Sequence, residues 1–275
     1  MDKARAVAAW RHIFLVTDLE GVAGVDSWEQ TRGSGPRYEE AINFATEEVN
    51  SVVKALLART EDNDHLAPRI TVWDGHGYGG LNLDRLDQRV TAYRHDDVRG
   101  FTGLLRETLS GVLPVDALAF IGQHAMEGSG GTLSHTYSSR RISGYSLNGR
   151  AIGEFGLRAL YAWALARIPT VFISGDDIAC REAQSLVPGI ICVQVKTSLG
   201  ITAACHLDHE ESCMQLTSKA ARILLQDDAD SLLQPSFVPE SPYVFRKKFK
   251  WKFGLVPRPP KTLRGESLTA VLEKE

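Results

Sequence analysis

The sequence predicts an α/β fold, a three-layer α/β/α arrangement with a mostly parallel central sheet and a smaller C-terminal portion containing β-strands. Short apolar runs alternate with longer helical stretches, which is typical of βαβ units around a parallel sheet. The 275 residues are 43% hydrophobic and 24% charged, as in ordinary globular proteins. A chain of this length can bury a sizeable core without disulfides.

The expected strands are short apolar runs bounded by turn-forming residues, at 13–17, 70–73, 89–93, 117–121, 170–174 and 190–195. Longer stretches with helical patterning predict helices at 39–57, 98–109, 154–166, 177–186 and 209–225. Asn148-Gly149 separates two further short runs, which predicts a β-hairpin at 142–152.

The tail after Gln226 is marked by prolines and leads into an alternating segment at 243–253. Its odd positions are mostly aromatic and its even positions mostly basic, so we expect a strand with one buried and one basic face. A nucleic-acid-binding strip is the alternative, but stacking platforms would have to interleave with the basic residues. We therefore expect an α/β core at 1–230 and a strand-containing extension at 231–275, packed on the core as a single functional unit.

Composition excludes several classes of protein. The formal net charge of −3 gives no general attraction to nucleic acid or to anionic membranes. The four cysteines form no CxxC pair, which argues against a disulfide scaffold or a zinc ribbon. No apolar run approaches the ~18 residues of a membrane span, and we expect a cytoplasmic protein without nucleic-acid or membrane partners.

Four segments place a potential metal ligand next to an apolar run. Asp18 and Glu20 follow the first expected strand, His76 the second and His124 the fourth, while Glu154 begins a helix after the hairpin. In open α/β sheets, ligands bind beyond the carboxyl ends of the strands. Glycines flank each of these positions and would let the backbone approach a metal closely.

These five side chains offer two imidazoles and three carboxylates, a nitrogen and oxygen set that suits zinc. The set exceeds the needs of one tetrahedral ion, and with one bridging carboxylate it suits two ions about 3.5–4 Å apart, as in two-metal hydrolases.

Two other sequence patterns that could indicate a binding site are weaker. The glycines at 75, 77 and 80 imitate a dinucleotide fingerprint, but the segment that follows is too short for a crossover helix.

The second weaker pattern is C-H-x2-H-x3-C at 205–213, which imitates a structural zinc site. Asp208 is expected to cap a helix that starts at His209, so Cys205 would not share its face with His209 and Cys213. We therefore interpret this cluster as structural.

Taken in order, TDLEG, DGHG, GQHA, LSHT and GEFGL resemble the M55 family of D-aminopeptidases, as do SGDD at 174–177 and VKTS at 195–198. The resemblance spans about residues 13 to 225. It implies a binuclear zinc aminopeptidase with two Zn²⁺ per subunit, held by Asp18, Glu20, His76, His124 and Glu154. It also implies that Asp18 bridges the ions and that His135 is catalytic, either as nucleophile or by positioning water.

The expected function is therefore hydrolysis of the N-terminal residue of short peptides or amides that contain D-amino acids. The resemblance also implies a homo-oligomer, a decameric ring. Two alternatives stay open: a metal-dependent hydrolase of another amide or a phosphoester, and a peptide-binding relative without turnover. The sequence departs from the family's DSH motif, since Gly75 stands where a serine is usual.

Overall fold

The computed structural model describes residues 10–58, 67–111, 114–225, 233–251 and 258–274. Its larger sheet has seven strands in the order β3-β2-β1-β4-β7-β8-β9. All neighbouring strands are parallel except β8 and β9, which confirms the mostly parallel sheet. The strands are β1 (His12–Thr17), β2 (Arg69–Asp74), β3 (Thr91–Tyr93), β4 (Ala117–Gln123), β7 (Thr170–Asp176), β8 (Ile191–Gly200) and β9 (Ala203–His206).

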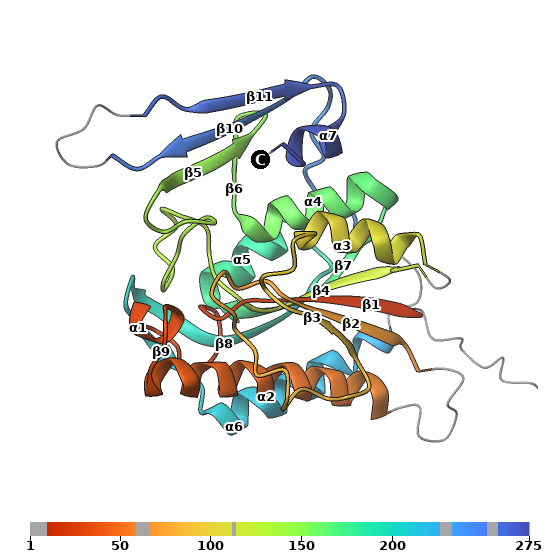
Figure 1. Cartoon of the computed structure of the whole chain (residues 1–275), viewed down its shortest axis with the longest axis vertical. Helices are drawn as coiled ribbons and strands as arrows, with labels where there is room; N and C mark the ends of the chain where they lie inside the picture. Colours follow the sequence, from red (N-terminus) through yellow and green to blue (C-terminus); the bar gives the residue numbers. More distant parts are fainter. Residues whose placement is uncertain (1–9, 59–66, 112–113, 226–232, 252–257, 275) are drawn as a thin grey trace, which may run out of the picture.

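Helices cover both faces of this sheet, as Figure 1 shows. One face is covered by α2 (Pro36–Ala58) and α6 (His209–Ala220), which pack on each other. The other face carries α3 (Gly100–Leu109), α4 (Glu154–Ala166) and α5 (Asp177–Leu186). The short helix α1 (Trp28–Thr31) packs against α2. These layers confirm the predicted α/β/α class.

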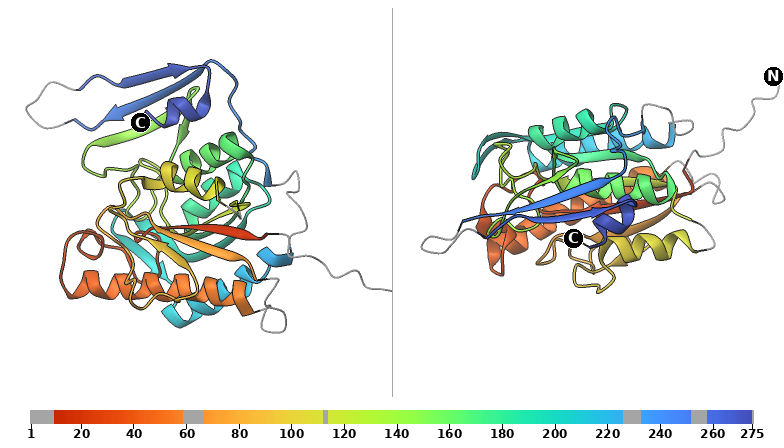
Figure 2. Two further views of the ribbon diagram at one scale, coloured as in Figure 1. Left: turned by 45° about the vertical axis from the view of Figure 1, so that its right-hand side comes forward. Right: turned by 90° about the horizontal axis from the view of Figure 1, so that it is seen from above.

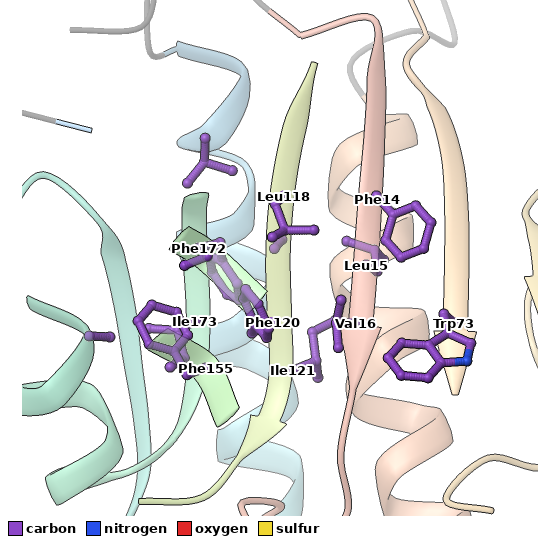
Figure 3. Packing of buried hydrophobic residues seen from close by; sticks show 14 of the residues in the cluster. Phe14, Leu15, Val16, Trp73, Leu118, Phe120, Ile121, Phe155, Phe172 and Ile173 are labelled. Atoms are coloured by element: carbon purple, nitrogen blue, oxygen red, sulfur yellow. The ribbon is translucent and has the colours of Figure 1, made fainter. Parts of the chain in front are cut away.

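The core lies between the sheet and these helices. Every residue of β1, β4 and β7 is buried, as expected for central strands of a parallel sheet covered on both faces. Figure 3 shows Phe120 of β4 beside Phe155 of α4, with ring centroids 5.0 Å apart in an edge-to-face contact. Such aromatic pairs stabilise the fold beyond their buried area.

A second, antiparallel sheet has the order β11-β10-β5-β6. The hairpin of β5 (Ile142–Leu147) and β6 (Arg150–Ile152) supplies one half, and β10 (Tyr243–Phe249) and β11 (Lys261–Gly265) supply the other. Figure 1 and the left view of Figure 2 place it beyond the helix layer that contains α4, with α7 (Leu268–Leu272) beside it. Segments about 90 residues apart in sequence therefore form one sheet.

The hairpin prediction is confirmed, with Asn148 and Gly149 both at positive φ. The strand expected at 190–195 is longer, extending to Gly200 as β8, and three further predicted ranges need correction. The strand expected at 89–93 is only Thr91–Tyr93, and the helix expected at 209–225 ends at Ala220 before a 3-10 turn at Ile223–Leu225. Helices commonly tighten in this way at their ends, and residue patterning does not separate the two forms.

The third correction concerns the strand expected at 243–253. Phe245 is buried and Arg246 and Lys248 are exposed, as the alternation predicts, but β10 ends at Phe249 and Trp251 is 73% exposed. The register with β5 shifts between Lys248 and Phe249, so the pairing that would continue the alternation stops there. Residues 252 and 253, and the predicted domain boundary at 230/231, lie outside the described residues.

No helix in the described ranges has both the length and the apolarity needed to cross a membrane.

Candidate metal centre

Three adjacent strands bring the predicted ligands together at one edge of the larger sheet. Asp18 directly follows β1, His124 directly follows β4, and His76 comes two residues after β2. Because β2, β1 and β4 are neighbours and parallel, their carboxyl ends meet at this edge. Glu154 does not follow one of these strands. It is the first residue of α4, where the helix dipole favours a carboxylate.

Asp18 lies between two imidazoles. Its Oδ1 is 3.2 Å from His76 Nδ1, and its Oδ2 is 3.4 Å from His124 Nε2. The backbone fixes this position, because Leu19 N–H donates to Oδ1 and Asp18 N–H donates to the Ile121 carbonyl of β4. The two oxygens of one carboxylate therefore face two different histidines.

Each histidine of the centre is oriented by a backbone carbonyl. His76 Nε2 lies 2.8 Å from the Thr31 oxygen, His124 Nδ1 lies 2.9 Å from the Ala125 oxygen, and His135 Nδ1 lies 2.9 Å from the Leu133 oxygen. A carbonyl oxygen only accepts, so the contacting ring nitrogen of each histidine is the N–H donor. In the neutral rings, the other nitrogen keeps its lone pair.

Those remaining nitrogens point at carboxylates. His76 Nδ1 is 3.1 Å from Glu20 Oε2, and His124 Nε2 is 3.5 Å from Glu154 Oε1. His135 Nε2 is farther from that oxygen, at 3.9 Å. Within the described chain, Glu20 Oε2 and His124 Nε2 are buried and have no hydrogen-bond partner. Lone pairs that face one another in this way require a proton or a metal ion between them.

The pKa shifts of Glu154 and His124 indicate the same need for a positive charge between the carboxylates and the imidazoles. Burial alone raises the pKa of Glu154, but the adjacent His124 imidazole and the Arg158 charge outweigh burial and hold the pKa at about 2. Burial lowers the pKa of His124, but Glu154 and Asp18 outweigh it and raise the pKa to about 10. The site therefore favours cations among its carboxylates.

His135 lies beside the ligand atoms. Its ring stacks on His124 with centroids 4.0 Å apart and planes 14° apart, and Trp28 contacts it edge-on. Two groups of side chains bring ligand atoms within 4.8 Å of one another: Asp18, Glu20 and His124, and His124, His135 and Glu154. The geometry alone thus allows His135 either to act on a bound molecule or to bind metal.

The glycines near the ligands bring strand ends together. A Cβ on Gly21 would lie 2.2 Å from the Gln123 oxygen, and one on Gly122 would lie 2.2 Å from the Asp18 oxygen. Gly122 also has φ of +71°, a region that favours glycine. The sequence-based expectation was an approach of backbone to metal; the contact seen at these two glycines is backbone to backbone, between the segments that carry Asp18 and His124.

Two further side chains support the site and were not predicted. Buried Arg158, one turn after Glu154 on α4, has Nη2 3.2 Å from Glu154 Oε2. Buried Asp74 accepts hydrogen bonds from the backbone of Gly80 and His76 and so shapes the loop that carries His76. In the sequence, the position of Arg158 four residues after Glu154, in an otherwise apolar helix, indicates that the two side chains can pair.

A cavity of about 210 Å³ opens at this centre. Its lining includes Asp18, Glu20, His76, His135 and Glu154 at one side. The remaining lining residues are Thr31, Arg32, Gly75, Gly77, Tyr78, Tyr137, Ser138, Ser139, Arg140 and Arg158.

The C-H-x2-H-x3-C residues lie elsewhere and contact other groups. Asp208 caps α6, as predicted, and His206 Nδ1 accepts the Gly24 N–H. His209 Nε2 is 2.9 Å from Glu47 Oε2 and 3.7 Å from Cys213 Sγ. The structural interpretation of these histidines is consistent with these contacts.

Comparison with known proteins gives one consistent family. Residues 12–252 match the model of the peptidase M55 family, described as D-aminopeptidase. A D-aminopeptidase of Bacillus subtilis (strain 168) is 26% identical over 226 residues, covering 81% of this chain and 77% of that protein.

A solved structure has the same fold. It is the Zn-dependent D-aminopeptidase DppA from Bacillus subtilis, described as a self-compartmentalizing protease. The TM-score is 0.77 at 20% sequence identity, covering 95% of this chain and 94% of the other.

Proposed function

Because this chain belongs to the peptidase M55 family of D-aminopeptidases, we propose that it is a zinc-dependent aminopeptidase. It removes the N-terminal residue of short peptides or amides, with a preference for D-amino acids. One observation carries the proposal: imidazole lone pairs and three carboxylates converge, and all three carboxylates line one small cavity. Neutral imidazole nitrogens and carboxylate oxygens repel one another at these distances unless cations lie between them.

The residues present fit zinc. Two ligands of a tetrahedral zinc ion, each about 2.0–2.1 Å from the metal, lie about 3.3–3.4 Å from each other. The separations here between imidazole nitrogens and carboxylate oxygens are 3.1, 3.2, 3.4 and 3.5 Å. In the proposal Asp18, Glu20, His76, His124 and Glu154 would hold the zinc ions, and Asp18, whose two oxygens face different histidines, would be shared between them.

The backbone carbonyls beside the histidines support the same ligand assignment. Metal-bound histidines usually donate their second N–H to a carbonyl or carboxylate, which fixes the tautomer and the ring plane. His76 and His124 do so through Thr31 and Ala125. Bound zinc supplies Lewis acidity, which polarises a carbonyl and makes water more acidic.

His135 is the proposed proton-handling residue. Its Nδ1 donates to Leu133, so its Nε2 can accept a proton from an attacking water or hold that water in place. The stacked His124 ring and the edge of Trp28 fix the plane in which Nε2 points. Arg158 holds the outer oxygen of Glu154 and so keeps its other oxygen toward His124.

The deciding experiment combines metal analysis with a substrate panel. The purified protein should contain two zinc ions per chain and should release D-Ala from D-Ala-D-Ala. A chelator should abolish turnover, and added zinc should restore it. L-Ala-L-Ala is the matched control for chirality. Equal or better turnover of the L-peptide would contradict the D-preference, and a folded protein that binds no zinc would contradict the metal assignment.

We further propose that copies of the chain assemble into a decameric ring, as family resemblance implies, and that the enzyme works in the cytoplasm. The self-compartmentalizing description of DppA and the shared fold support assembly. All four cysteines are free, which fits a reducing compartment. Light scattering tests the assembly, and a stable monomer at assay concentration would contradict it.

A further inference from the structure

Besides the carboxylates, the cavity is lined by three arginines, Arg32, Arg140 and Arg158. Arg32 and Arg140 both line the metal cavity and also a wider outer groove of about 560 Å³. Ser139 is the third residue shared by the two spaces. The two arginines therefore border both the metal cavity and the groove.

Arg32 is held in place by uncharged contacts. Its guanidinium carbon lies 3.9 Å from the centre of the Trp28 ring, and its Nη2 donates to Ser139 Oγ at 2.5 Å. Stacking on an aromatic ring fixes the guanidinium plane and leaves other N–H groups free for a ligand. The group is thus oriented before any ligand binds.

The charges of this pair are not balanced locally. In the described chain, neither Arg32 nor Arg140 forms an ion pair with a carboxylate, whereas the third arginine of the cavity, Arg158, already pairs with Glu154. Partial burial and then the Arg140 charge lower the pKa of Arg32, against the opposing charge of Glu20. Two neighbouring cations that form no ion pair in the described chain favour an anionic ligand.

We propose that Arg32 and Arg140 bind a carboxylate carried by the leaving residue of the substrate. The inference rests on the proposed aminopeptidase function and defines its substrate class. Both arginines line the same small cavity as the proposed metal ligands, which favours a carboxylate on the residue next to the scissile bond. Both a dipeptide C-terminus and an acidic side chain at that residue meet this requirement.

Three substrates with the same N-terminal residue test the proposal. D-Ala-D-Ala carries a C-terminal carboxylate, D-Ala-D-Ala amide carries none, and D-Ala-D-Glu α-amide carries a side-chain carboxylate only. The expected kcat/KM for D-Ala-D-Ala exceeds that for its amide by about 10- to 100-fold, the size of a charge-assisted interaction, mostly through KM. The third substrate decides between the two sources of the carboxylate.

Variants then assign the preference to the pair. In Arg32→Gln/Arg140→Gln, the ratio of kcat/KM between D-Ala-D-Ala and its amide should fall to near one, and Arg32→Lys should keep part of it. Arg150→Gln is the matched control, because Arg150 also stacks on an aromatic ring, Phe237, and donates to a serine, Ser185, outside the cavity.

The outcomes separate this inference from the function on which it rests. Turnover of none of the three substrates by the zinc-loaded protein would overturn the aminopeptidase proposal itself. Equal turnover of acid and amide by the unaltered protein, or an unchanged ratio in the double variant, would overturn only the carboxylate site.

Discussion

At the scale of single residues, His135 and His124 are stacked yet differ in their surroundings. His124 Nε2 has oxygens of Asp18 and Glu154 within 3.5 Å, whereas His135 Nε2 has Glu154 alone, at 3.9 Å. A nitrogen with fewer carboxylate neighbours is better placed to exchange a proton with substrate than to hold a metal permanently. This difference separates the two histidines chemically.

His135→Ala is therefore expected to keep both zinc ions and to lose about 10²- to 10⁴-fold in kcat, the usual contribution of a general acid or base. Metal content and steady-state kinetics with D-Ala-D-Ala measure the two effects. His206→Gln, outside the cavity, is the control. Loss of one zinc ion in His135→Ala would make His135 a ligand instead.

A second residue-scale prediction concerns pH. The hydrogen bond between His209 and the Cys213 thiol, opposed by burial and helped by Glu47, raises the pKa of His209 to about 9. The unfolded chain has a histidine pKa of about 6.5, so the folded state binds more protons between these values. The stabilisation is fully present below about pH 6.5 and is lost as the pH rises to about 9.

Urea unfolding of the zinc-loaded protein and of His209→Gln, at pH 6, 7.5 and 9, checks this prediction. The difference in the free energy of unfolding between them should shrink as the pH rises. Subtracting the variant removes the titration of other groups. A difference that stays constant over this range would refute the linkage.

The sequence predicts the metal-ligand candidates but not the two arginines of the proposed carboxylate site. The five metal-ligand candidates follow strand ends or begin a helix, so one topological rule locates them. Arg32 and Arg140 are far apart in sequence and meet only because two loops fold over one cavity. Neither spacing nor composition contains that information.

At the scale of secondary structure, capping residues explain which bounds could be predicted. The predicted ranges 154–166 and 177–186 match α4 and α5, because Gly153 and Asp176 mark their starts. The helix α1 has only four residues and β11 is largely exposed, so neither produces a recognisable pattern. Both elements depend on tertiary contacts.

The loop after β2 offers a matched pair of glycines around His76. A Cβ on Gly75 would lie 2.6 Å from the Thr17 oxygen, whereas one on Gly77 meets nothing within 4 Å. Gly75→Ala should therefore push β2 away from β1, destabilise the protein by about 1–3 kcal/mol and reduce zinc content.

Gly77→Ala should change the free energy of unfolding by no more than about 0.5 kcal/mol. Thermal unfolding and metal analysis of both variants provide the comparison. Equal behaviour of the two would show that the approach of Gly75 to β1 does not hold the His76 loop in place.

At the scale of the whole molecule, we propose that the α/β core at 1–230 and the extension at 231–275 form one folding unit. In the second sheet β5 pairs with β6 on one side and with β10 on the other, and buried Phe245 packs against Tyr145. The helix α7 packs on α4, the helix that begins with Glu154.

A chain ending at residue 230 is therefore expected to lose zinc and to unfold at a lower temperature or aggregate, because β5 would present an unpaired edge. A chain ending at residue 266 keeps β10 and β11 without α7 and is the control, with a smaller loss. Circular dichroism and metal analysis measure both. A stable, zinc-loaded 1–230 chain would show that the core folds alone.

The order of the strands along the chain also determines when the second sheet can form during synthesis. The strand β6 ends two residues before Glu154, yet its sheet is completed only by β10, translated about 90 residues later. At about 5–20 residues per second, a ribosome needs roughly 5–18 seconds to cross that interval. A nascent chain that has exposed every proposed metal ligand thus still lacks the sheet beside the last of them, and the peptidase can complete this sheet only after β10 and β11 have been synthesised.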